Sequence, residues 1–335
     1  MTGRDKAASA VAGGEFAFIR DILAPLAGDC EAALGLADDA ALIAPPAGRQ
    51  MVVTKDMIVA GRHYPPNMPA ALVGRRLLRV NLSDLAAMGA RPEYFLLGLA
   101  LDEDDPRAWL EDFASGLGAD MERFGIALIG GDTVAGRGAS TLSLTAIGSL
   151  AEGDALCRGG GRIGDDIYVS GTIGDGALGL WARQGGLGAL GAAHRDYLSG
   201  RFELPQPRLG LGMALSALAH AAIDISDGLL ADLGHLAAAS GCAAALCFED
   251  LPLSDAAAAA LAFDDGRWET IVSGGDDYEL LFAADPGKSA EIARLGAELG
   301  VRLSRIGTLR DGAGVAMTRG GDIVSPAHRG YVHFS

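Results

Sequence analysis

The aspartates of this sequence constrain its fold more than any other feature, because they stand beside apolar runs, at strand ends and glycine turns. An apolar segment that leads straight into carboxylates occurs several times along the chain. Turns and helix N-termini favour aspartate, and this preference accounts for any single position about as well as a functional role does. It accounts less well for the whole set, which comprises Asp38, Asp39, Asp56, Asp84, Asp132, Asp224, Asp227, Asp276 and Asp277.

Carboxylates that meet in one cleft raise one another's pKa and oppose folding unless cations neutralise them. Mg²⁺ prefers a few carboxylates together with water and the phosphate oxygens of a substrate. Such a site reverses the sign of the local field, so that an acidic protein can bind a polyphosphate. The aspartate set therefore predicts metal-dependent phosphate chemistry.

The composition indicates a globular protein and limits its partners. The chain has 335 residues, of which 50% are hydrophobic, and a formal net charge of −16. That length suggests two domains, and that balance suggests a packed core. An acidic field repels a polyanion, so we expect no nucleic-acid partner. No apolar run approaches the roughly 20 residues of a membrane helix, so we expect no membrane partner.

The cysteines indicate a reducing environment. Cys30, Cys157, Cys242 and Cys247 are scattered and form no CxxC pair. A disulfide framework would need denser spacing. We therefore expect reduced thiols in a cytoplasmic protein.

Hydrophobic periodicity predicts strands and helices in both halves of the chain. In the first half it predicts helices at residues 16–27, 70–88 and 106–124, and strands at 41–44, 51–53, 93–101, 126–129 and 140–149. The glycine run at residues 159–161 marks a domain boundary. Beyond it we expect strands at 166–170, 222–225, 243–248 and 279–283, and helices after residue 171 and at 209–220, 229–240, 254–261 and 289–299. The alternation predicts an α/β fold.

Two glycine patterns suggest other nucleotide-binding motifs. Gly287-Lys288-Ser289 is similar to the end of a Walker A loop, but Phe282 stands where that loop needs glycine, so we reject it. The segment from Gly174 to Gly179 matches GxGxxG after an expected strand and before a helix. A single match among 49 glycines is weak evidence for a dinucleotide site.

Basic residues near the acidic motifs are few. His63 follows Asp56 by seven residues, although a lone histidine is more often a surface or structural residue. Arg158 adjoins the glycine run, where the backbone could close around phosphate, but a solvated loop residue explains it equally well. The three lysines are Lys6, Lys55 and Lys288, so phosphate contacts must come mainly from arginine, amides and metal ions.

Four segments together, in order, resemble the thiamine-monophosphate kinase family of the aminoimidazole-ribonucleotide-synthetase-like superfamily. They are residues 82–90 (LSDLAAMGA), 129–133 (IGGDT), 223–229 (IDISDGL) and 273–280 (SGGDDYEL). The resemblance runs from residues 14–16 to residues 330–334, nearly the whole chain.

The resemblance implies transfer of the γ-phosphoryl group of ATP to thiamine monophosphate, which gives thiamine diphosphate and ADP. It also implies a two-domain α/β (α+β) fold. The N-terminal α/β domain, residues 1–150, would bind ATP and Mg²⁺ and form a homodimer through its sheet. The C-terminal α/β domain, residues 151–335, would close a cleft that holds ATP and several Mg²⁺ ions.

Site residues follow from the resemblance, motif by motif. The implied metal ligands are Asp39, Thr54, Lys55, Asp56, Asp84, Asp132, Asp224 and Asp227. The implied ATP contacts are Gly131, Asp132, Arg158 and Ser226. The implied thiamine monophosphate contacts are His63, Asp276 and Tyr331.

The chain departs from the family pattern at two positions. Ala37 replaces a glycine before the paired aspartates, which narrows the backbone freedom of that turn. Lys55 stands where the family has threonine beside a metal. Coordination through the carbonyl of residue 55 would tolerate this change, whereas coordination through a hydroxyl would not; a lysine there would also neutralise part of the acidic cluster.

The expected reaction needs no general base, because the second pKa of a phosphate monoester is about 6 and the attacking oxygen is mostly anionic. In-line transfer is then a problem of charge screening and positioning, which Mg²⁺ can solve. The alternatives are another enzyme of the superfamily, such as a selenophosphate or aminoimidazole ribonucleotide synthetase or a hydrogenase-maturation dehydratase, and a non-catalytic divalent-cation-binding protein. A dinucleotide-binding oxidoreductase rests on Gly174 to Gly179 alone.

Overall fold

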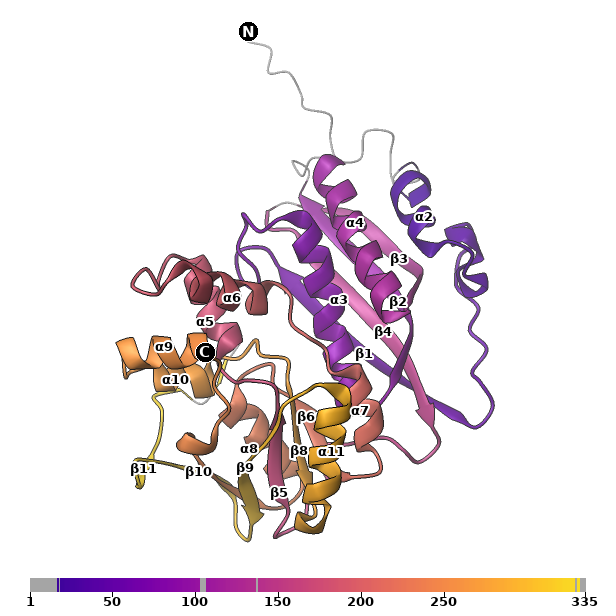
Figure 1. Cartoon of the computed structure of the whole chain (residues 1–335). Coiled ribbons are helices and arrows are strands. Elements are labelled where there is room, and N and C mark those ends of the chain that lie inside the picture. The colour runs from indigo at the N-terminus through magenta and orange to yellow at the C-terminus, as the bar shows by residue number, and fades with distance from the viewer. Residues whose placement is uncertain (1–16, 18, 103–106, 137, 329, 332–335) are drawn as a thin grey trace. The chain divides into compact units, whose positions relative to one another are not determined.

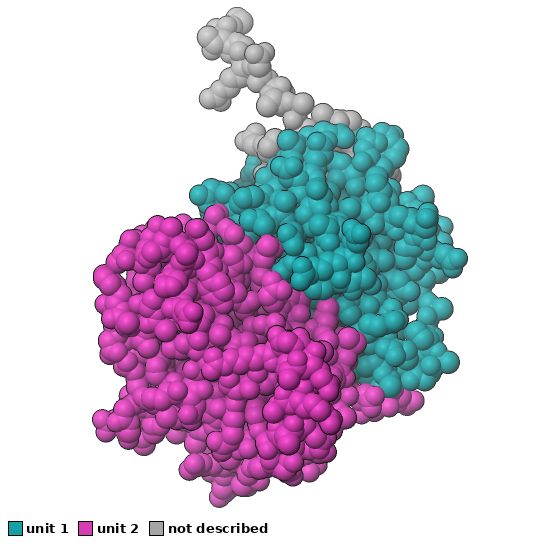
Figure 2. All heavy atoms as spheres, in the orientation of Figure 1, with its two compact units in different colours: residues 1–85, 91–151 teal, residues 86–90, 152–335 magenta. Residues whose placement is uncertain are grey.

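The structure is a computed structural model, which describes residues 17, 19–102, 107–136, 138–328 and 330–331 (Figure 1). It forms two compact units, coloured separately in Figure 2. Unit 1 contains residues 1–85 and 91–151, and unit 2 contains residues 86–90 and 152–335. The outer ends of the family resemblance, at residues 14–16 and 332–334, and the expected helix start at Pro106 lie outside the described residues.

Unit 1 is built on a four-stranded sheet in the order β1-β4-β2-β3. The strands are β1 (Arg49–Val59), β2 (Arg91–Asp102), β3 (Ala127–Gly136) and β4 (Thr141–Ala151). β4 is antiparallel to both β1 and β2, and β3 is parallel to β2. The helices α3 (Ala70–Ala87) and α4 (Arg107–Phe124) cover one face of this sheet (Figure 1). Side chains alternate along a strand, which puts the buried Leu97 and Leu99 on the covered face.

The opposite face of the unit 1 sheet is covered only in part. A small core of Ala27, Ala33, Ile129 and Ile147 joins the sheet to the N-terminal segment. That segment contains a π-helical turn (Ile19–Leu23), α2 (Ala24–Ala27) and a 3-10 helix (Glu31–Leu36). Elsewhere on β1 and β3, large apolar side chains remain exposed: Val53, Met57 and Val134.

Unit 2 contains a seven-stranded sheet in the order β11-β10-β7-β9-β5-β8-β6. Its strands are β5 (Asp166–Ser170), β6 (Ala219–Asp224), β7 (Ala243–Cys247), β8 (Leu280–Ala284), β9 (Leu303–Arg310), β10 (Gly314–Arg319) and β11 (Asp322–Val324). Its helices are α5 (Asp175–Arg183), α6 (Ala192–Glu203), α7 (Leu209–Leu215), α8 (Leu229–Ala239), α9 (Asp255–Phe263), α10 (Arg267–Ser273) and α11 (Ser289–Leu299). The buried strands β5 and β8 lie beside each other, antiparallel, and contribute Ile167, Val169 and Leu281 to the core.

The predicted two-domain α/β architecture is confirmed, but several elements were wrong or missed. Residues 41–44 form no strand, and the expected helix at 209–220 ends at Leu215, with β6 beginning at Ala219. The helices α6 and α10 and the strands β9, β10 and β11 were not predicted. None of the described helices has the length and apolar character needed to cross a bilayer. The four cysteines are free thiols.

Candidate active site

In unit 1, the end of α3 meets the middle of β1 and joins three of the predicted site residues. The Thr54 hydroxyl donates a hydrogen bond of 2.5 Å to Asp84 Oδ2. One turn earlier on α3, the buried Asn81 accepts the backbone N–H of Asp56 at 2.9 Å and donates to the carbonyl of Leu77. The structure therefore brings Thr54, Asp56 and Asp84 together and holds them between a helix and an edge strand.

The side chain of Lys55 does not belong to this group. Successive side chains of a strand point to opposite faces, so Lys55 lies on the face opposite Thr54 and Asp56. Its neighbours on that face are the exposed Val53 and Met57. If residue 55 contributes to a metal site beside Asp84, only its backbone carbonyl is available, and the replacement of threonine by lysine does not remove that oxygen.

Gly131 and Asp132 lie on the other edge of the same sheet. The strand register aligns Asp56 with Leu144, Leu144 with Leu97, and Leu97 with Gly131. Three strand spacings of about 4.8 Å separate the two edge backbones by roughly 14 Å. Within unit 1 the structure therefore does not bring the backbones of Gly131 and Asp132 beside those of Asp56 and Asp84.

His63 lies in the turn that follows β1. Its Nδ1 accepts the backbone N–H of Val59 at 3.0 Å, which leaves the proton of the neutral ring on Nε2. This contact fixes the ring at the end of the strand that carries Asp56.

Asp38 and Asp39 lie in an exposed bend after the first 3-10 helix, where the Asp38 carboxylate accepts the Asp39 N–H at 2.9 Å. The preceding Ala37 has a φ of −111°, which any L-residue adopts. The glycine that the family has there is therefore not needed for the backbone of this chain. The left-handed residues of the turn are Leu34, Gly35 and Leu36.

Unit 2 gathers a second acidic group at the end of β6. The strand ends at Asp224, which is 4% exposed, and residues 225–228 form the loop to α8, which we call the acidic loop. The Asp276 N–H donates to the carbonyl of Ser226 at 2.9 Å, and the Tyr331 N–H donates to the carbonyl of Asp227 at 3.0 Å. Three segments far apart in the sequence thus place their predicted site residues together.

The acidic loop is held by Asp232, which sequence reasoning missed. Its Oδ2 accepts the backbone N–H groups of Ser226, Asp227 and Gly228 at 3.0 to 3.1 Å. Burial raises the pKa of Asp232 to about 7, and the nearby Asp227 adds to the rise, whereas the three amide hydrogen bonds act against it. Asp232 is a residue of the first turn of α8, so one side chain ties the loop to the helix that follows it.

Arg158 lies beside the outer edge of β6. The carbonyl of Cys157 accepts the N–H of Ala222 at 2.9 Å, and the carbonyl of Arg158 accepts the Ser240 hydroxyl. Arg158 is exposed. It directly follows Cys157, whose hydrogen-bond partner Ala222 lies two residues before Asp224. A long guanidinium side chain at this position can reach an anion held near the end of β6.

The GxGxxG segment binds a carboxylate of the protein itself. The amides of Gly174 and Gly176 donate to the two carboxylate oxygens of Asp277 at 2.7 and 2.9 Å. Burial raises the pKa of Asp277 to about 8, although these two hydrogen bonds lower it. Because the amides of Gly174 and Gly176 already donate to a carboxyl group of the protein, this segment does not offer them to the phosphates of a dinucleotide.

Glu279 forms a third buried contact in the same stretch of chain. Arg208 binds both of its carboxylate oxygens, and Arg201 donates to Oε1 at 2.8 Å. The Ser170 hydroxyl donates to Oε2 at 2.6 Å. Two guanidinium groups and a hydroxyl therefore compensate a carboxylate that is fully buried.

The donors of both acidic groups are carboxylate, hydroxyl and carbonyl oxygens, which suit a hard cation such as Mg²⁺. Among the residues that the structure describes, no three His, Cys, Asp or Glu side chains form a metal cluster by themselves. Asn81 and Asp232 escaped sequence reasoning, and Asp277 was grouped with the aspartates expected to bind metal, because their roles depend on backbone partners. The only sequence signal for them is a polar residue inside an otherwise apolar helix or motif.

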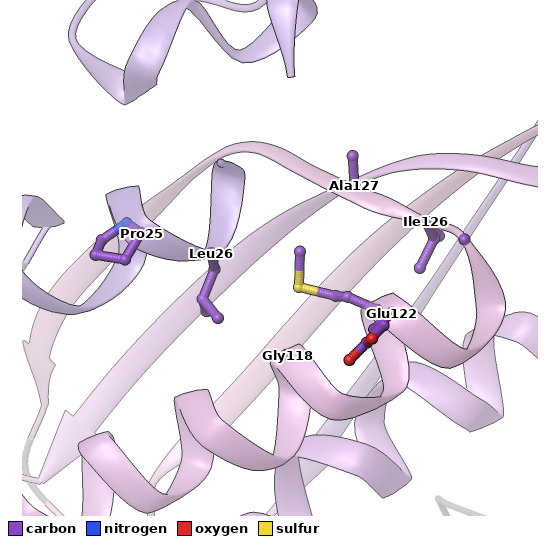
Figure 3. Close-up of a pocket in the computed structure, with 8 residues that line it drawn as sticks. Pro25, Leu26, Gly118, Glu122, Ile126 and Ala127 are labelled. Atoms are coloured by element: carbon purple, nitrogen blue, oxygen red, sulfur yellow. The ribbon is translucent and has the colours of Figure 1, made fainter. Parts of the chain in front are cut away.

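A separate pocket of about 460 Å³ lies in unit 1, between α2, α4 and the start of β3 (Figure 3). Its lining is mostly apolar and contains none of the predicted site residues: Pro25, Leu26, Gly118, Met121, Glu122, Gly125, Ile126 and Ala127.

Comparison with known proteins shows the family of the chain. Residues 37–150 match the model of the AIR synthase related protein N-terminal domain, and residues 162–319 match that of the C-terminal domain. A thiamine-monophosphate kinase of Caulobacter vibrioides is 42% identical over 323 residues, which cover 95% of this chain and 90% of the relative.

Solved structures give the same result. The thiamine-monophosphate kinase of Stenotrophomonas maltophilia superposes with a TM-score of 0.82 at 45% identity, over 92% of this chain and 98% of that one. AaThiL complexed with AMPPCP and TMP superposes with a TM-score of 0.76 at 27% identity, over 99% and 100% of the two chains. The hydrogenase maturation protein HypE, at 20% identity and a TM-score of 0.76, shares the fold. The chain belongs to the thiamine-monophosphate kinases, within the AIR synthase related proteins.

Proposed function

We propose that this protein transfers the γ-phosphoryl group of ATP to thiamine monophosphate and releases thiamine diphosphate and ADP. The observation that carries the proposal is the acidic group of unit 2, where Asp276 and Tyr331 are hydrogen-bonded to the loop of Ser226 and Asp227. Relatives named thiamine-monophosphate kinase and a neighbour complexed with AMPPCP and TMP support it. An enzyme of the superfamily with another substrate is not favoured.

The dependence on Mg²⁺ follows from how the phosphates can be bound. Amides at a helix N-terminus are a common phosphate site, but Asp277 accepts those of Gly174 and Gly176 at the start of α5, and Asp232 accepts those of Asp227 and Gly228 just before α8. Lysines are also scarce, with three in the chain. The charge of two polyanions must then be met by arginine and by cations, which the oxygen donors of both units can hold.

Within this proposal, the implied ligands fall into separate groups. Thr54, Asp56 and Asp84 form one set of oxygen donors, and Asp224 and Asp227 form another. Asp132 lies on the opposite edge of the unit 1 sheet, and the exposed Asp39 and the carbonyl of Lys55 complete the list. When bound, Mg²⁺ supplies charge neutralisation and orientation of phosphate oxygens.

Contacts to the organic ligands are assigned by position. Gly131, Asp132, Arg158 and Ser226 would contact ATP, and His63, Asp276 and Tyr331 would contact thiamine monophosphate. Tyr331 is 45% exposed although its backbone is fixed, so its ring is accessible to a thiamine ring for stacking. No residue needs to act as a general base, because the attacking phosphate oxygen is already anionic.

The partly uncovered face of the unit 1 sheet supports a homodimer. Val53, Met57 and Val134 are each at least half exposed on two strands of one sheet. Burying such a face against a second copy removes apolar surface from water. A cytoplasmic location remains part of the proposal, based on the scattered cysteines.

An ADP-release assay tests the proposed reaction. Turnover is compared with thiamine monophosphate, with thiamine and with no acceptor, each in the presence and absence of EDTA. The proposal predicts turnover only with the monophosphate and its loss on chelation. Turnover with free thiamine would indicate a different kinase, and metal binding without any turnover would indicate a non-catalytic protein.

A further inference from the structure

Residues 274–279 form a turn with an unusual backbone. Asp276 has a φ of 64° and Tyr278 a φ of 51°, so two non-glycine residues within three positions are left-handed. L-residues adopt this conformation at an energetic cost, and it persists only where surrounding contacts enforce it. The turn also carries the Asp276 N–H that bonds Ser226 in the acidic loop.

Two buried carboxylates hold this turn, one in its middle and one at its end. Asp277 is 2% exposed and accepts the amides of Gly174 and Gly176. Glu279 is fully buried and binds Arg201 and Arg208. These anchors come from the start of α5, from α6 and from the segment before α7, and they add to the backbone hydrogen bonds that join Asp276 and Tyr278 to residues 225–226.

The start of α5 also touches the peptide of Asp276 directly. A Cβ at Gly176 would lie 2.1 Å from the carbonyl oxygen of Asp276, so only glycine allows this approach. A shift of the α5 N-terminus relative to the turn would therefore move Asp276. The Asp277 carboxyl group, which accepts the amides of both Gly174 and Gly176, ties the start of α5 to the turn.

We propose that Asp277 is a positioning residue for the reaction. By accepting hydrogen bonds from the GxGxxG amides, Asp277 keeps Asp276 beside the acidic loop and in the left-handed conformation. The inference rests on the proposed function, because it requires Asp276 to contact thiamine monophosphate. It gives the GxGxxG segment a role that differs from nucleotide binding. Burial raises the pKa of Asp277, which means that its ionised form is destabilised there. A carboxyl group that served packing alone would cost folding free energy at this position.

The test measures KM for each substrate in D277N, D276A and the double variant. Asn retains the shape of Asp277 but presents an NH₂ group to one of the two amide donors. We expect KM for thiamine monophosphate to rise about tenfold in D277N, as misplacement of a contact residue does, with KM for ATP within about twofold of wild type. In the D276A background, the D277N substitution should add little further.

A matched control is D285N. Asp285 also accepts a glycine amide, that of Gly287 at 2.7 Å, at the opposite end of β8 and in an exposed position. Both Michaelis constants should remain at the wild-type level. If D277N does not fold, R208K loosens the paired contact to Glu279 from a partly exposed position and should raise KM for thiamine monophosphate about threefold.

The outcomes separate the two proposals. A wild-type protein without turnover on thiamine monophosphate contradicts the proposed function. If wild type is active and D276A raises KM, but D277N leaves it unchanged or raises it equally in both backgrounds, the positioning role is wrong. Equal changes in both Michaelis constants would also reject it, since they indicate a general disturbance.

Discussion

At the scale of single residues, Asp84 is the best test of the group formed by Thr54, Asp56 and Asp84. Its carboxylate accepts the Thr54 hydroxyl and can also supply an oxygen to a cation. We predict that Asp84→Asn lowers kcat by about 100-fold or more, since the neutral amide oxygen of asparagine binds a cation more weakly than the carboxylate does. Asp84 is not fully buried, so the melting temperature should change little. Steady-state kinetics and thermal unfolding check this, with the exposed Asp265→Asn as the control; near-normal turnover would remove Asp84 from the site.

The sequence identified the carboxylates but not the hydrogen bonds that hold the site in place. Asp56, Asp224 and Asp276 stand in short motifs whose order is visible in one dimension. Asp277 bonds amides about a hundred positions earlier, and Asn81 bonds the backbone of another element. Nothing in local spacing signals such partners, because hydrogen-bond acceptance by a side chain depends on where the fold brings the backbone.

At the scale of elements, the contact between α5 and the turn at 274–279 predicts a steric effect. In Gly176→Ala the new Cβ would lie 2.1 Å from Asp276 O, so one of the two segments must shift. We expect a loss of about 1–3 kcal/mol of unfolding free energy and a higher KM for thiamine monophosphate. Gly188→Ala is the control, because its Cβ would meet nothing within 4 Å. Equal stability of the two variants would contradict the close contact.

A chain of hydrogen bonds between side chains joins three strands of unit 1 at one end, and it should make the unfolding free energy depend on pH. Arg49 donates to the Ser149 hydroxyl, and Ser149 donates to Glu93 at 2.7 Å. Burial alone would raise the pKa of Glu93, but the hydrogen bonds from Ser149 and Arg91 outweigh it and hold the pKa below its ordinary value of 4.5. A carboxyl with a lowered folded pKa contributes stability above its unfolded pKa and loses it as the pH falls through the folded pKa.

We therefore predict that Glu93→Gln is about 1 kcal/mol less stable than wild type at pH 7 and equally stable once the pH falls below the folded pKa. Urea unfolding across pH 3–7 measures the difference. A constant gap at all values of pH would show that the ionised form of Glu93 contributes nothing.

Element prediction failed where periodicity could not choose between structures. Residues 209–223 form an almost continuous apolar stretch, which a turn at 216–218 divides into α7 and β6. Residues 41–44 are apolar, but Leu42 is 70% exposed and the segment has no strand beside it, so it forms no ladder. The helix α6 carries polar side chains on most of its surface and lacks the apolar stripe that would have identified it.

At the scale of the whole molecule, the exposed apolar side chains of the unit 1 sheet predict self-association. Val53→Asp should shift the protein from dimer to monomer in analytical ultracentrifugation, because a carboxylate would be buried without a partner. Ile323→Asp, which changes an 80% exposed side chain of unit 2, should leave the sedimentation unchanged. A monomeric wild-type protein would contradict the assignment of this face.

The proposed reaction requires oxygen donors that hold Mg²⁺ between two phosphate-bearing ligands, and a Mg²⁺ titration of turnover tests this most directly. Wild-type protein and Asp224→Asn are treated with EDTA, and ADP release with thiamine monophosphate is followed as Mg²⁺ is restored. We predict no turnover before Mg²⁺ is added, and a half-maximal Mg²⁺ concentration about tenfold higher or more for the variant. Turnover that survives chelation, or an identical Mg²⁺ requirement in both proteins, would contradict the account.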